Sequence, residues 1–169
     1  MNDKLTAEEA RRIFSYDTET GELKWAVTLS PAAVKGKPCA AKNFHGYYTV
    51  KVRGKTYLVH RVVWLMMTGS FPTTTIDHIN RVRSDNRWSN LRLATITQQA
   101  GNTIRTDGKV TGVRGVRMCG KKFQARIRTK NPVTGESRLV HLGTFPTLEL
   151  AKAAYDAIAK DYFGEFYQP

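Results

Sequence analysis

The chain has 169 residues, of which 41% are apolar and 24% charged, so it is long enough for one domain of ordinary size or two small ones. Lysine and arginine number 27 against 14 aspartate and glutamate. The net charge of +13 favours nucleic acid, and then an anionic membrane, as the partner over a basic surface that only keeps the protein soluble. The two cysteines lie far apart and outside any C-x-x-C pair, which argues against a zinc ribbon or a disulfide framework.

The N-terminal part is predicted to combine a short helix with antiparallel strands. Thr6-Ala7-Glu8-Glu9 has the pattern of a capping box, so we expect a helix directly after Thr6. A turn at 17–21 then leads into a strand at 23–27. Residues 46–59 have the pattern of a β-hairpin that turns at Arg53-Gly54.

Charges of one sign dominate the stretch that follows Glu22. It has no acidic residue before Asp77, and it includes the predicted hairpin and a helix at 59–68 that ends before a glycine. Surfaces that only provide solubility usually mix both signs, so we expect this stretch to lie against phosphates. Lys51 and Arg53 of the hairpin are candidate DNA contacts. The basic residues of the stretch are Lys24, Lys35, Lys37, Lys42, Lys51, Arg53, Lys55 and Arg61.

A second module is predicted at the C-terminus. The apolar periodicity fades around 105–110, which we interpret as a linker between a domain at 1–104 and a domain at 111–169. Strands are predicted at 111–118, 121–129 and 138–144. A helix after Thr147 follows, because its apolar residues recur at helical spacing on one face. The fold class is therefore α+β, with antiparallel strands in both domains.

Asp77 and His78 are the residues whose side chains are best suited to catalysis. Neighbours on a strand point to opposite faces, but at a strand end or a bulge both side chains can reach one site. The carboxylate can then bind a metal, while an imidazole with an ordinary pKa of about 6.5 accepts a proton from water. A divalent cation can stabilise the charge on a phosphate and its leaving oxygen. A surface Asp-His pair in a loop is the alternative.

The residues around this pair resemble the HNH endonuclease family, in its phage and intron-associated, homing-endonuclease-like branch. The resemblance extends from the N-terminal helix to about Asn102. It implies a β-β-α unit that holds one metal. The matching segments are Tyr16-Asp17-x-x-Thr20-Gly21-x-Leu23-x-Trp25, His60-Arg61, Ile76-Asp77-His78-Ile79-Asn80 and Asp85-Asn86-Arg87-x-x-Asn90-Leu91-Arg92.

The resemblance implies a role for each matched site residue. His78 would be the general base that activates the attacking water, Asp77 a metal ligand, and Asn90 the residue that orients His78. A divalent cation, Mg²⁺ or another such as Mn²⁺, would stabilise the departing 3′ oxygen, leaving 5′-phosphate and 3′-hydroxyl ends. The family's third position falls at Gln99, where an Asn or His is usual. Asn102 is the alternative ligand if the register of the helix shifts.

Two further histidines have separate interpretations. His60 precedes Arg61 at the start of an apolar helix. It is either a structural histidine that donates a hydrogen bond or a residue that lies near the site and orients the site residues. His45, next to Gly46, is interpreted as a turn residue.

The predicted C-terminal sheet has one polar and basic face. From Arg105 to His141 there are ten basic and two acidic residues. In the strand at 121–129, apolar residues alternate with long polar ones, so one face would pack on the helix and the other would meet DNA or solvent. The DNA-binding candidates in this module are Arg114, Arg117, Gln124, Arg126, Arg128 and His141.

This module also resembles the ethylene-response-factor (Apetala-two) DNA-binding domain, which occurs fused to HNH nucleases. That family reads DNA with arginine and tryptophan residues of its sheet, but all three tryptophans here precede residue 105. The matching stretches are Phe123-x-Ala125-Arg126-Ile127-Arg128, Leu142-Gly143-Thr144-Phe145, Glu149-x-Ala151-x-x-Ala154-Tyr155-Asp156 and Phe163-Gly164-Glu165-Phe166.

Taken together, the sequence predicts a metal-dependent DNA endonuclease, that is, a hydrolase of phosphodiester bonds that its C-terminal module holds on double-stranded DNA. A catalytically weak or inactive DNA-binding regulator is the alternative, for which Gln99 is the reason. RNA binding is supported by charge alone. We expect a monomer rather than a dimer, and no membrane partner. The charged N-terminus and the lack of an apolar span predict a cytoplasmic protein, in the host cell if a phage encodes it.

Overall fold

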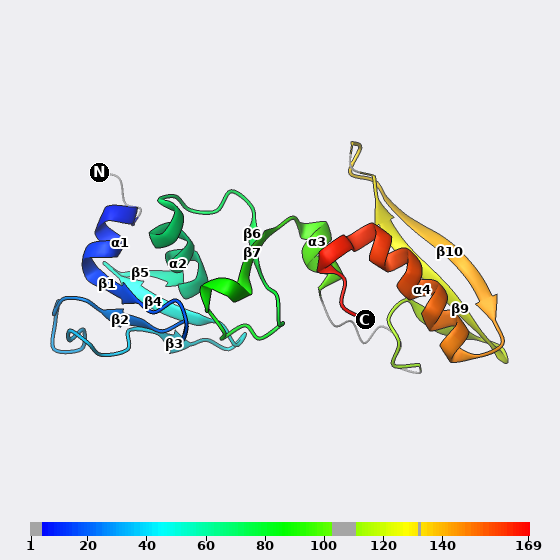
Figure 1. Ribbon diagram of the computed structural model, residues 1–169, viewed down its shortest axis with the longest axis horizontal. Helices are drawn as coiled ribbons and strands as arrows, with labels where there is room; N and C mark the ends of the chain where they lie inside the picture. Colours follow the sequence, from blue (N-terminus) through cyan, green and yellow to red (C-terminus); the bar gives the residue numbers. More distant parts are fainter. Residues whose placement is uncertain (1–4, 103–110, 132) are drawn as a thin grey trace. The chain divides into compact units, whose positions relative to one another are not determined.

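The computed structural model describes residues 5–102, 111–131 and 133–169. The chain divides into two compact units, residues 1–95 and residues 96–169. Each unit combines helices with small antiparallel sheets (Figure 1), which confirms the predicted mixed fold class at this level. None of the helices in the described ranges is long and apolar enough to cross a membrane.

The first unit begins with the predicted capped helix. Helix α1 spans Ala7–Ile13, and the Thr6 side-chain oxygen accepts a hydrogen bond from the Glu9 backbone N–H at 3.1 Å. The chain continues into β1 (Phe14–Tyr16), which pairs antiparallel with β2 (Leu23–Trp25). The sequence does not predict β1, because three residues are too few to show an alternation of burial.

A three-stranded sheet follows, with the predicted hairpin at its centre. Strands β4 (Tyr48–Val52) and β5 (Lys55–Leu58) pair antiparallel, and β3 (Ala41–Lys42) lies on the other side of β4. Arg53 and Gly54 both have positive φ, at 48° and 79°. This combination is typical of a two-residue turn whose twist matches that of the flanking strands.

Helix α2 and the strands beneath it form the core of the first unit. It spans Val59–Thr68 and ends at Gly69, whose φ of 86° no bulky residue adopts readily. Val62 and Val63 of α2 are fully buried against α1 and the small sheets. The other most buried side chains of this core are Ala10, Phe14, Ile13, Val50, Val59, Leu23 and Leu65.

The last sheet of the first unit carries the candidate site. Strand β6 (Thr75–His78) pairs antiparallel with β7 (Leu91–Ala94). The loop between them contains a short 3-10 helix, η1 (Trp88–Asn90). The Ile79 backbone N–H donates to the Asn90 carbonyl oxygen at 2.9 Å, which closes the base of this loop.

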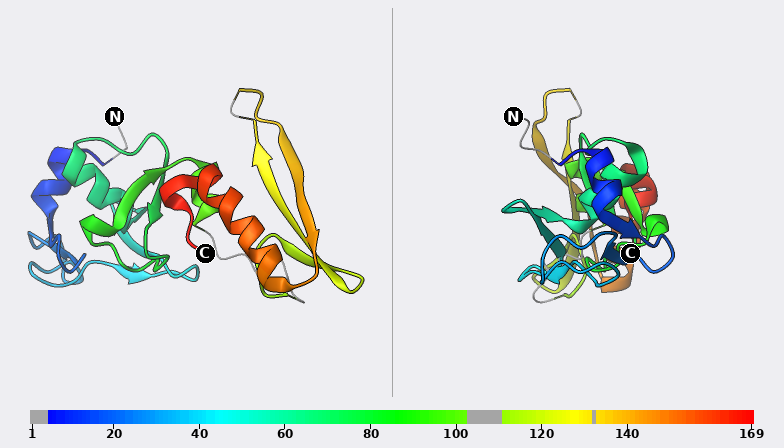
Figure 2. Two further views of the ribbon diagram at one scale, coloured as in Figure 1. Left: turned by 45° about the vertical axis from the view of Figure 1, so that its right-hand side comes forward. Right: turned by 90° about the vertical axis from the view of Figure 1, so that its left-hand side faces the viewer.

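The second unit is a three-stranded antiparallel sheet packed on a long helix. Ala125 and Ile127 of the central strand are buried against Ala151, Tyr155 and Ala159 of the helix. Figures 1 and 2 show helix α4 running along this sheet. The elements are α3 (Ile96–Gly101), β8 (Val116–Cys119), β9 (Lys122–Lys130), β10 (Ser137–Phe145), α4 (Leu148–Phe163) and η2 (Gly164–Phe166), with strand order β10-β9-β8.

Two boundaries differ from the sequence-based expectation. The predicted strand at 111–118 begins only at Val116, because Gly112 and Gly115 have φ of 66° and 70° and turn the chain before it. Helix α3, which the sequence places in the N-terminal domain, groups with the second unit. The predicted linker at 105–110 lies outside the described residues.

Candidate functional site

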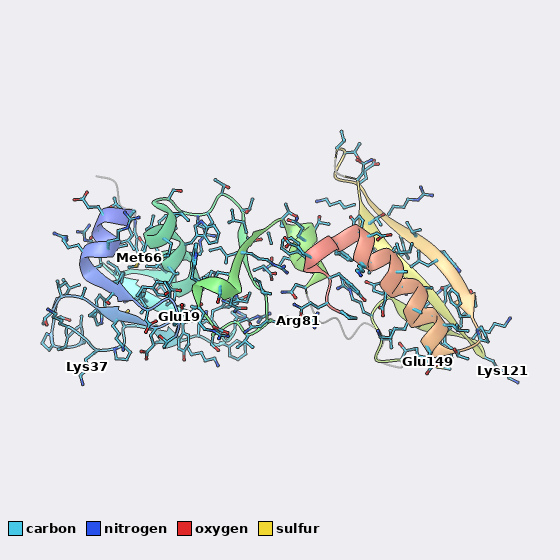
Figure 3. All side chains as sticks on the ribbon, in the orientation of Figure 1. Glu19, Lys37, Met66, Arg81, Lys121 and Glu149 are labelled. Atoms are coloured by element: carbon cyan, nitrogen blue, oxygen red, sulfur yellow. The ribbon has the colours of Figure 1, made fainter. Side chains whose placement is uncertain are left out.

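Asp77 and His78 are the last two residues of β6, and each is 5% exposed. In the β6–β7 pair Asp77 lies opposite Arg92, and His78 lies opposite Leu91. The chain turns directly after the strand, since the Arg81 N–H donates to the His78 carbonyl oxygen at 2.9 Å and Arg81 has a φ of 65°. Figure 3 labels Arg81 in this loop. The strand end that the chemistry requires is therefore present.

Two aromatic rings from distant segments pack against His78. The ring centroids of His60, on α2, and His78 lie 5.1 Å apart, with an interplanar angle of 87°. Tyr47 lies 5.9 Å from His78 and 5.4 Å from His60, and the Arg83 guanidinium lies 5.1 Å from the Tyr47 ring centroid. Of the two alternatives for His60, the structure places it beside the candidate site. The part played by Tyr47 has no signal in the sequence pattern.

Burial controls the charge of both imidazoles. It lowers the pKa of His78 below the usual 6.5, and the hydrogen bond with Asn86 and the charge of Asp77 oppose this less strongly. It lowers the pKa of His60 to about 3, and the charges of His78 and Arg61 add to the effect. Both rings are therefore neutral at neutral pH. His78 is then in the protonation state that a general base needs.

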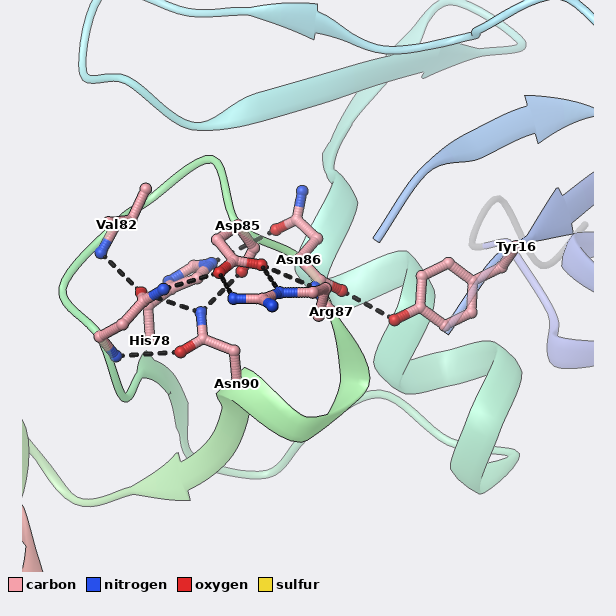
Figure 4. Close-up of polar contacts among 8 residues, drawn as sticks. Tyr16, His78, Val82, Asp85, Asn86, Arg87 and Asn90 are labelled. Carbon is pink, nitrogen blue, oxygen red and sulfur yellow. Dashed lines mark hydrogen bonds and ion pairs between the residues drawn. The ribbon is translucent and has the colours of Figure 1, made fainter. Parts of the chain in front are cut away.

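The amide of Asn86 makes the contact with His78 that the family resemblance implies for Asn90. Asn86 Oδ1 lies 3.3 Å from His78 Nε2, and Asn86 is only 2% exposed. The Tyr16 hydroxyl donates to the Asn86 backbone carbonyl oxygen at 2.7 Å (Figure 4). A carbonyl oxygen beside Nε2 favours the tautomer that is protonated there, which leaves the lone pair on Nδ1.

Asn90 holds the loop between β6 and β7 instead. Its Oδ1 accepts a hydrogen bond from the Asn80 backbone N–H at 2.9 Å. Its Nδ2 donates to Asn80 Oδ1 at 3.0 Å and to the Asp85 backbone carbonyl oxygen at 2.8 Å. Asp85 in turn accepts from Arg87, whose hydrogen bond is the main reason that the pKa of this carboxyl falls to about 2. The network in Figure 4 therefore fixes the loop that presents Asn86.

Asp77 forms a buried ion pair with Arg92 across the two strands. Arg92 Nε and Nη2 each lie 3.0 Å from Asp77 Oδ2. The Arg92 side chain is 15% exposed and the Asp77 side chain 7%. A buried carboxylate requires a partner of this kind, because an unpaired charge away from water is costly. Arg92 therefore lies beside the candidate site, although the sequence pattern alone indicates no role for it there.

The donors near His78 suit a hard divalent cation that takes few protein ligands. In the described ranges no group of three or more His, Cys, Asp or Glu side chains could hold a metal ion. Asp77 supplies a buried carboxylate, and Mg²⁺ commonly combines one or two such ligands with water and substrate phosphate. Asp77 is therefore the described carboxylate next to His78 that could anchor a divalent cation.

The two candidates for a second ligand lie in the second unit. Gln99 is part of α3, which begins at Ile96, close to the predicted capping position. The helix ends at Gly101, and Asn102 follows it directly. Asn102 is buried, at 4% exposed.

The candidate DNA-binding residues of the second unit gather mainly on the outer face of its sheet, defined by Arg117, Gln124, Arg126, Arg128 and His141. Arg117 lies opposite Gln124, and Arg126 lies opposite His141. The Arg117 Nε donates to Gln124 Oε1 at 2.7 Å, and Gln124 Nε2 lies 3.5 Å from His141 Nε2. Cross-strand partners share a face, so these residues form rows across the strands.

Arg114 and Arg53 have other partners. Arg114 Nη1 and Nη2 donate to the carbonyl oxygens of Gly101 and Ala100, each at 2.7 Å, so its guanidinium lies against α3 and not on the outer face. Arg53 Nη2 lies 2.6 Å from Glu9 Oε1. Lys51, on β4, is exposed.

Comparison with known proteins finds a similarity over the segment that contains this site. Residues 57–100 match the family model of the HNH endonuclease. An uncharacterized HNH endonuclease of Acanthamoeba polyphaga mimivirus is 32% identical over 125 residues, which cover 73% of this chain and 62% of the relative. The match thus spans less than two thirds of that relative's length. No solved structure matches the chain. Residues 57–100 are therefore similar to the HNH endonuclease family, and this segment includes Asp77, His78 and Asn90.

Proposed function

We propose that this protein is a DNA endonuclease that hydrolyses phosphodiester bonds with one divalent metal ion and a histidine general base. One observation carries the proposal: a buried, neutral His78 adjoins the buried carboxylate of Asp77 at a strand end, inside the segment that matches the HNH endonuclease family.

His78 would accept the proton of the attacking water through Nδ1. Asn86 supports this assignment because its Oδ1 lies at Nε2 and favours the tautomer with the proton there. Tyr47 and His60 pack against the ring and limit its rotation. Asn90 would act on His78 indirectly, because it holds the loop that carries Asn86.

Asp77 would hold the metal, with Gln99 as a second oxygen ligand. When bound, Mg²⁺ or Mn²⁺ stabilises negative charge on the phosphate and on its leaving oxygen. Arg92 would hold the Asp77 carboxylate in place, since two of its donors meet Oδ2.

The second unit would bind double-stranded DNA through the outer face of its sheet. The rows formed by Arg117 with Gln124 and by Arg126 with His141 offer several donors to phosphates and base edges. A module linked to the nuclease raises the local concentration of DNA at the active site, so modest affinity in each part gives tight binding. We propose that the protein acts as a monomer.

The test is incubation of the purified protein with supercoiled plasmid in Mg²⁺ or Mn²⁺ and in EDTA. We expect metal-dependent conversion to open circles or linear DNA. His78→Ala should lower the rate by about 100-fold or more, because a general base typically contributes that much, while affinity for DNA stays close to that of the wild type. His45→Ala, which removes an exposed histidine of the same unit, is the matched control and should retain metal-dependent cleavage. A His78→Ala variant that cleaves at the wild-type rate would refute the assigned chemistry.

A DNA-binding regulator derived from an HNH nuclease is the second candidate. The ion pair between Arg92 and Asp77 favours it, since a cation already neutralises the one carboxylate expected to bind metal. The same experiment separates the two functions. Tight DNA binding without cleavage in any metal would support the regulator and identify Gln99 as a disabling change.

A further inference from the structure

Residues 43–46, between β3 and β4, form a tight turn that we call the hairpin tip. The Gly46 backbone N–H donates to the Asn43 carbonyl oxygen at 3.0 Å, and the Asn43 N–H donates to the Tyr47 carbonyl oxygen at 2.8 Å. The Asn43 side-chain oxygen accepts from the Tyr47 N–H at 3.0 Å. Gly46 has a φ of 84°, the left-handed conformation that closes a short hairpin loop. The backbone that carries Phe44 is therefore held in one shape.

Phe44 projects from the hairpin tip with 99% of its surface exposed. A side chain without buried surface adds nothing to the hydrophobic core, so folding does not require an aromatic residue here. The turn does not require one either, since glycine, proline, asparagine, aspartate and serine are the residues that favour turns. Single exposed apolar residues are common, so exposure alone does not indicate a partner. The surroundings of Phe44 indicate which partner would cover it.

The hairpin tip contacts the candidate site within the first unit. Tyr47 follows the tip directly, and its ring lies 5.9 Å from the His78 ring. Arg83, in the loop after His78, donates from Nη1 to the His45 backbone carbonyl oxygen at 3.0 Å, and its guanidinium lies 5.1 Å from the Tyr47 ring centroid. Phe44 precedes Tyr47 by three residues, a span of at most about 11 Å, whereas one turn of a DNA duplex is about 34 Å long. A duplex bound at His78 therefore reaches Phe44 within one helical turn.

Exposed basic side chains lie against the hairpin tip. Arg83 is one of them, and Lys42 is the other, since its Cε lies 4.0 Å from the position that a Cβ on Gly46 would take. The Asp85 carboxylate, in the same loop as Arg83, is bound by Arg87 at 2.6 Å. An exposed aromatic ring beside exposed cations matches a polyanion with an apolar interior. Stacked base pairs behind two phosphate backbones are such a partner.

We propose that Phe44 is a wedge that inserts between neighbouring base pairs of DNA beside the candidate site, while Lys42 and Arg83 contact the flanking phosphates. The inference rests on the proposed function, because it takes double-stranded DNA as the substrate. Inserted phenylalanine, leucine, isoleucine or methionine side chains unstack a base step and kink the duplex. Pyrimidine–purine steps unstack most easily, so Phe44 contributes to the choice of the cleavage site.

Three variants isolate the ring. Phe44→Ala removes it, whereas Phe44→Leu keeps an apolar side chain that can enter the base stack. Leu29→Ala is the matched control, because Leu29 is a 54% exposed apolar residue of the same unit outside the hairpin tip. Each replaced side chain is exposed, so the urea midpoint of every variant should equal that of the wild type.

Relaxation of closed circular plasmid by a topoisomerase that needs no divalent cation measures insertion directly. The reaction is run in EDTA at saturating protein, and the linking number is read on a gel after the protein is removed. We expect the wild type, Phe44→Leu and Leu29→Ala to lower the linking number, because unstacking unwinds the duplex, and Phe44→Ala to lose most of this shift. Equal linking numbers for Phe44→Ala and the wild type would overturn the inference.

Fluorescence anisotropy of a labelled duplex in EDTA distinguishes insertion from a phosphate contact. Phe44→Ala should weaken binding by about tenfold, the effect typical of one lost contact between an aromatic ring and a base, and leave the slope of log K against log salt unchanged. Lys42→Ala should instead reduce that slope by about 0.9. Wild-type affinity in Phe44→Ala would contradict the wedge.

Two further outcomes separate this inference from its alternatives. Binding to vesicles of phosphatidylcholine and phosphatidylserine that depends on Phe44, with a linking number that does not, would assign the ring to a lipid surface and overturn the wedge. A Phe44-dependent linking number in a protein that cuts no plasmid in Mg²⁺ or Mn²⁺ would support the wedge and overturn the nuclease. Cleavage in metal with a linking number that is independent of Phe44 would do the reverse.

Discussion

His60 and His78 are two buried imidazoles in ring contact, and burial keeps both of them neutral. For His78 neutrality is useful, because only the neutral ring accepts a proton. For His60 neutrality lowers the stability of the folded protein at low pH. The Nδ1 atom of His60 is buried and has no hydrogen-bond partner among the described residues, so nothing near it stabilises the charged ring.

The stability of the first unit should therefore decrease as the pH falls below 6.5. The folded protein leaves His60 neutral down to a pH of about 3, whereas the unfolded chain takes up the proton near 6.5. The unfolded state then binds more protons, and the free energy of unfolding falls by about 1 kcal/mol per pH unit. Urea unfolding followed by tryptophan fluorescence reports this unit, since it contains Trp25, Trp64 and Trp88. In His60→Gln the slope between pH 5 and 6 should be smaller by about that amount; an equal slope would refute the assignment.

Asn86 gives a second test at this scale. Asn86→Ala removes the oxygen at His78 Nε2, so we expect the cleavage rate at saturating DNA to fall by about tenfold or more, without a matching loss of DNA affinity. Tyr16→Phe is the matched control, because it removes the hydroxyl that donates to the Asn86 backbone and leaves the Asn86 side chain in place. It should cost about 1 kcal/mol of stability and leave the rate per folded molecule unchanged. Equal rates in Asn86→Ala and the wild type would show that Asn86 does not orient the base.

Among the elements, the loop between β6 and β7 has the densest polar network around the site. Asn90 bridges its two ends, and Asp85 and Arg87 brace its far side. Because this loop carries Asn86 and follows His78 directly, its order determines how well the His78 ring is oriented.

Removing the Asn90 side chain should loosen this loop. Asn90→Ala leaves the Asn80 N–H and the Asp85 carbonyl oxygen without the partners described above, which should lower the free energy of unfolding by about 1–3 kcal/mol. Hydrogen exchange should show faster exchange at residues 79–86 and little change in β4 and β5. Asn90→Asp retains the acceptor for the Asn80 N–H but loses both donors, so its effect should be intermediate. A rigid loop in Asn90→Ala would contradict the role given to this residue.

At the scale of the whole molecule, the chain joins a unit that contains the Asp77-His78 pair to a unit with a basic sheet face. The outer face is one side of a sheet whose other side is covered by α4. Association with DNA through such a face releases counterions, so affinity should fall steeply with salt.

Arg126→Ala combined with Arg128→Ala should weaken DNA binding and flatten its salt dependence. Each lost phosphate contact reduces the slope of log K against log salt by about 0.9, so the double variant should lose roughly 2. The charge-matched control is Lys152→Ala combined with Lys160→Ala, on α4. Fluorescence anisotropy of a labelled duplex at several salt concentrations measures both. An unchanged slope in the arginine variant would move the DNA-binding surface elsewhere.

Much of the fold is predictable from local sequence signals. The capping box at Thr6, the turn at Arg53-Gly54 and the end of α2 at Gly69 are all present as predicted, because each depends on residues close together in the chain. The short strands β1 and β3 are not predictable, since their pairing depends on partners elsewhere in the unit.

The sequence by itself determined the charge, the α+β composition and the Asp77-His78 pair, because net charge, periodicity and motif spacing are properties of the chain. Only the tertiary structure decided that Asn86 rather than Asn90 contacts His78, that His60 lies beside it, and that Arg114 turns to α3. These contacts join residues far apart in sequence or choose between similar neighbours. Which neighbour makes the contact depends on how the loop and the helices pack, and spacing along the chain does not specify that.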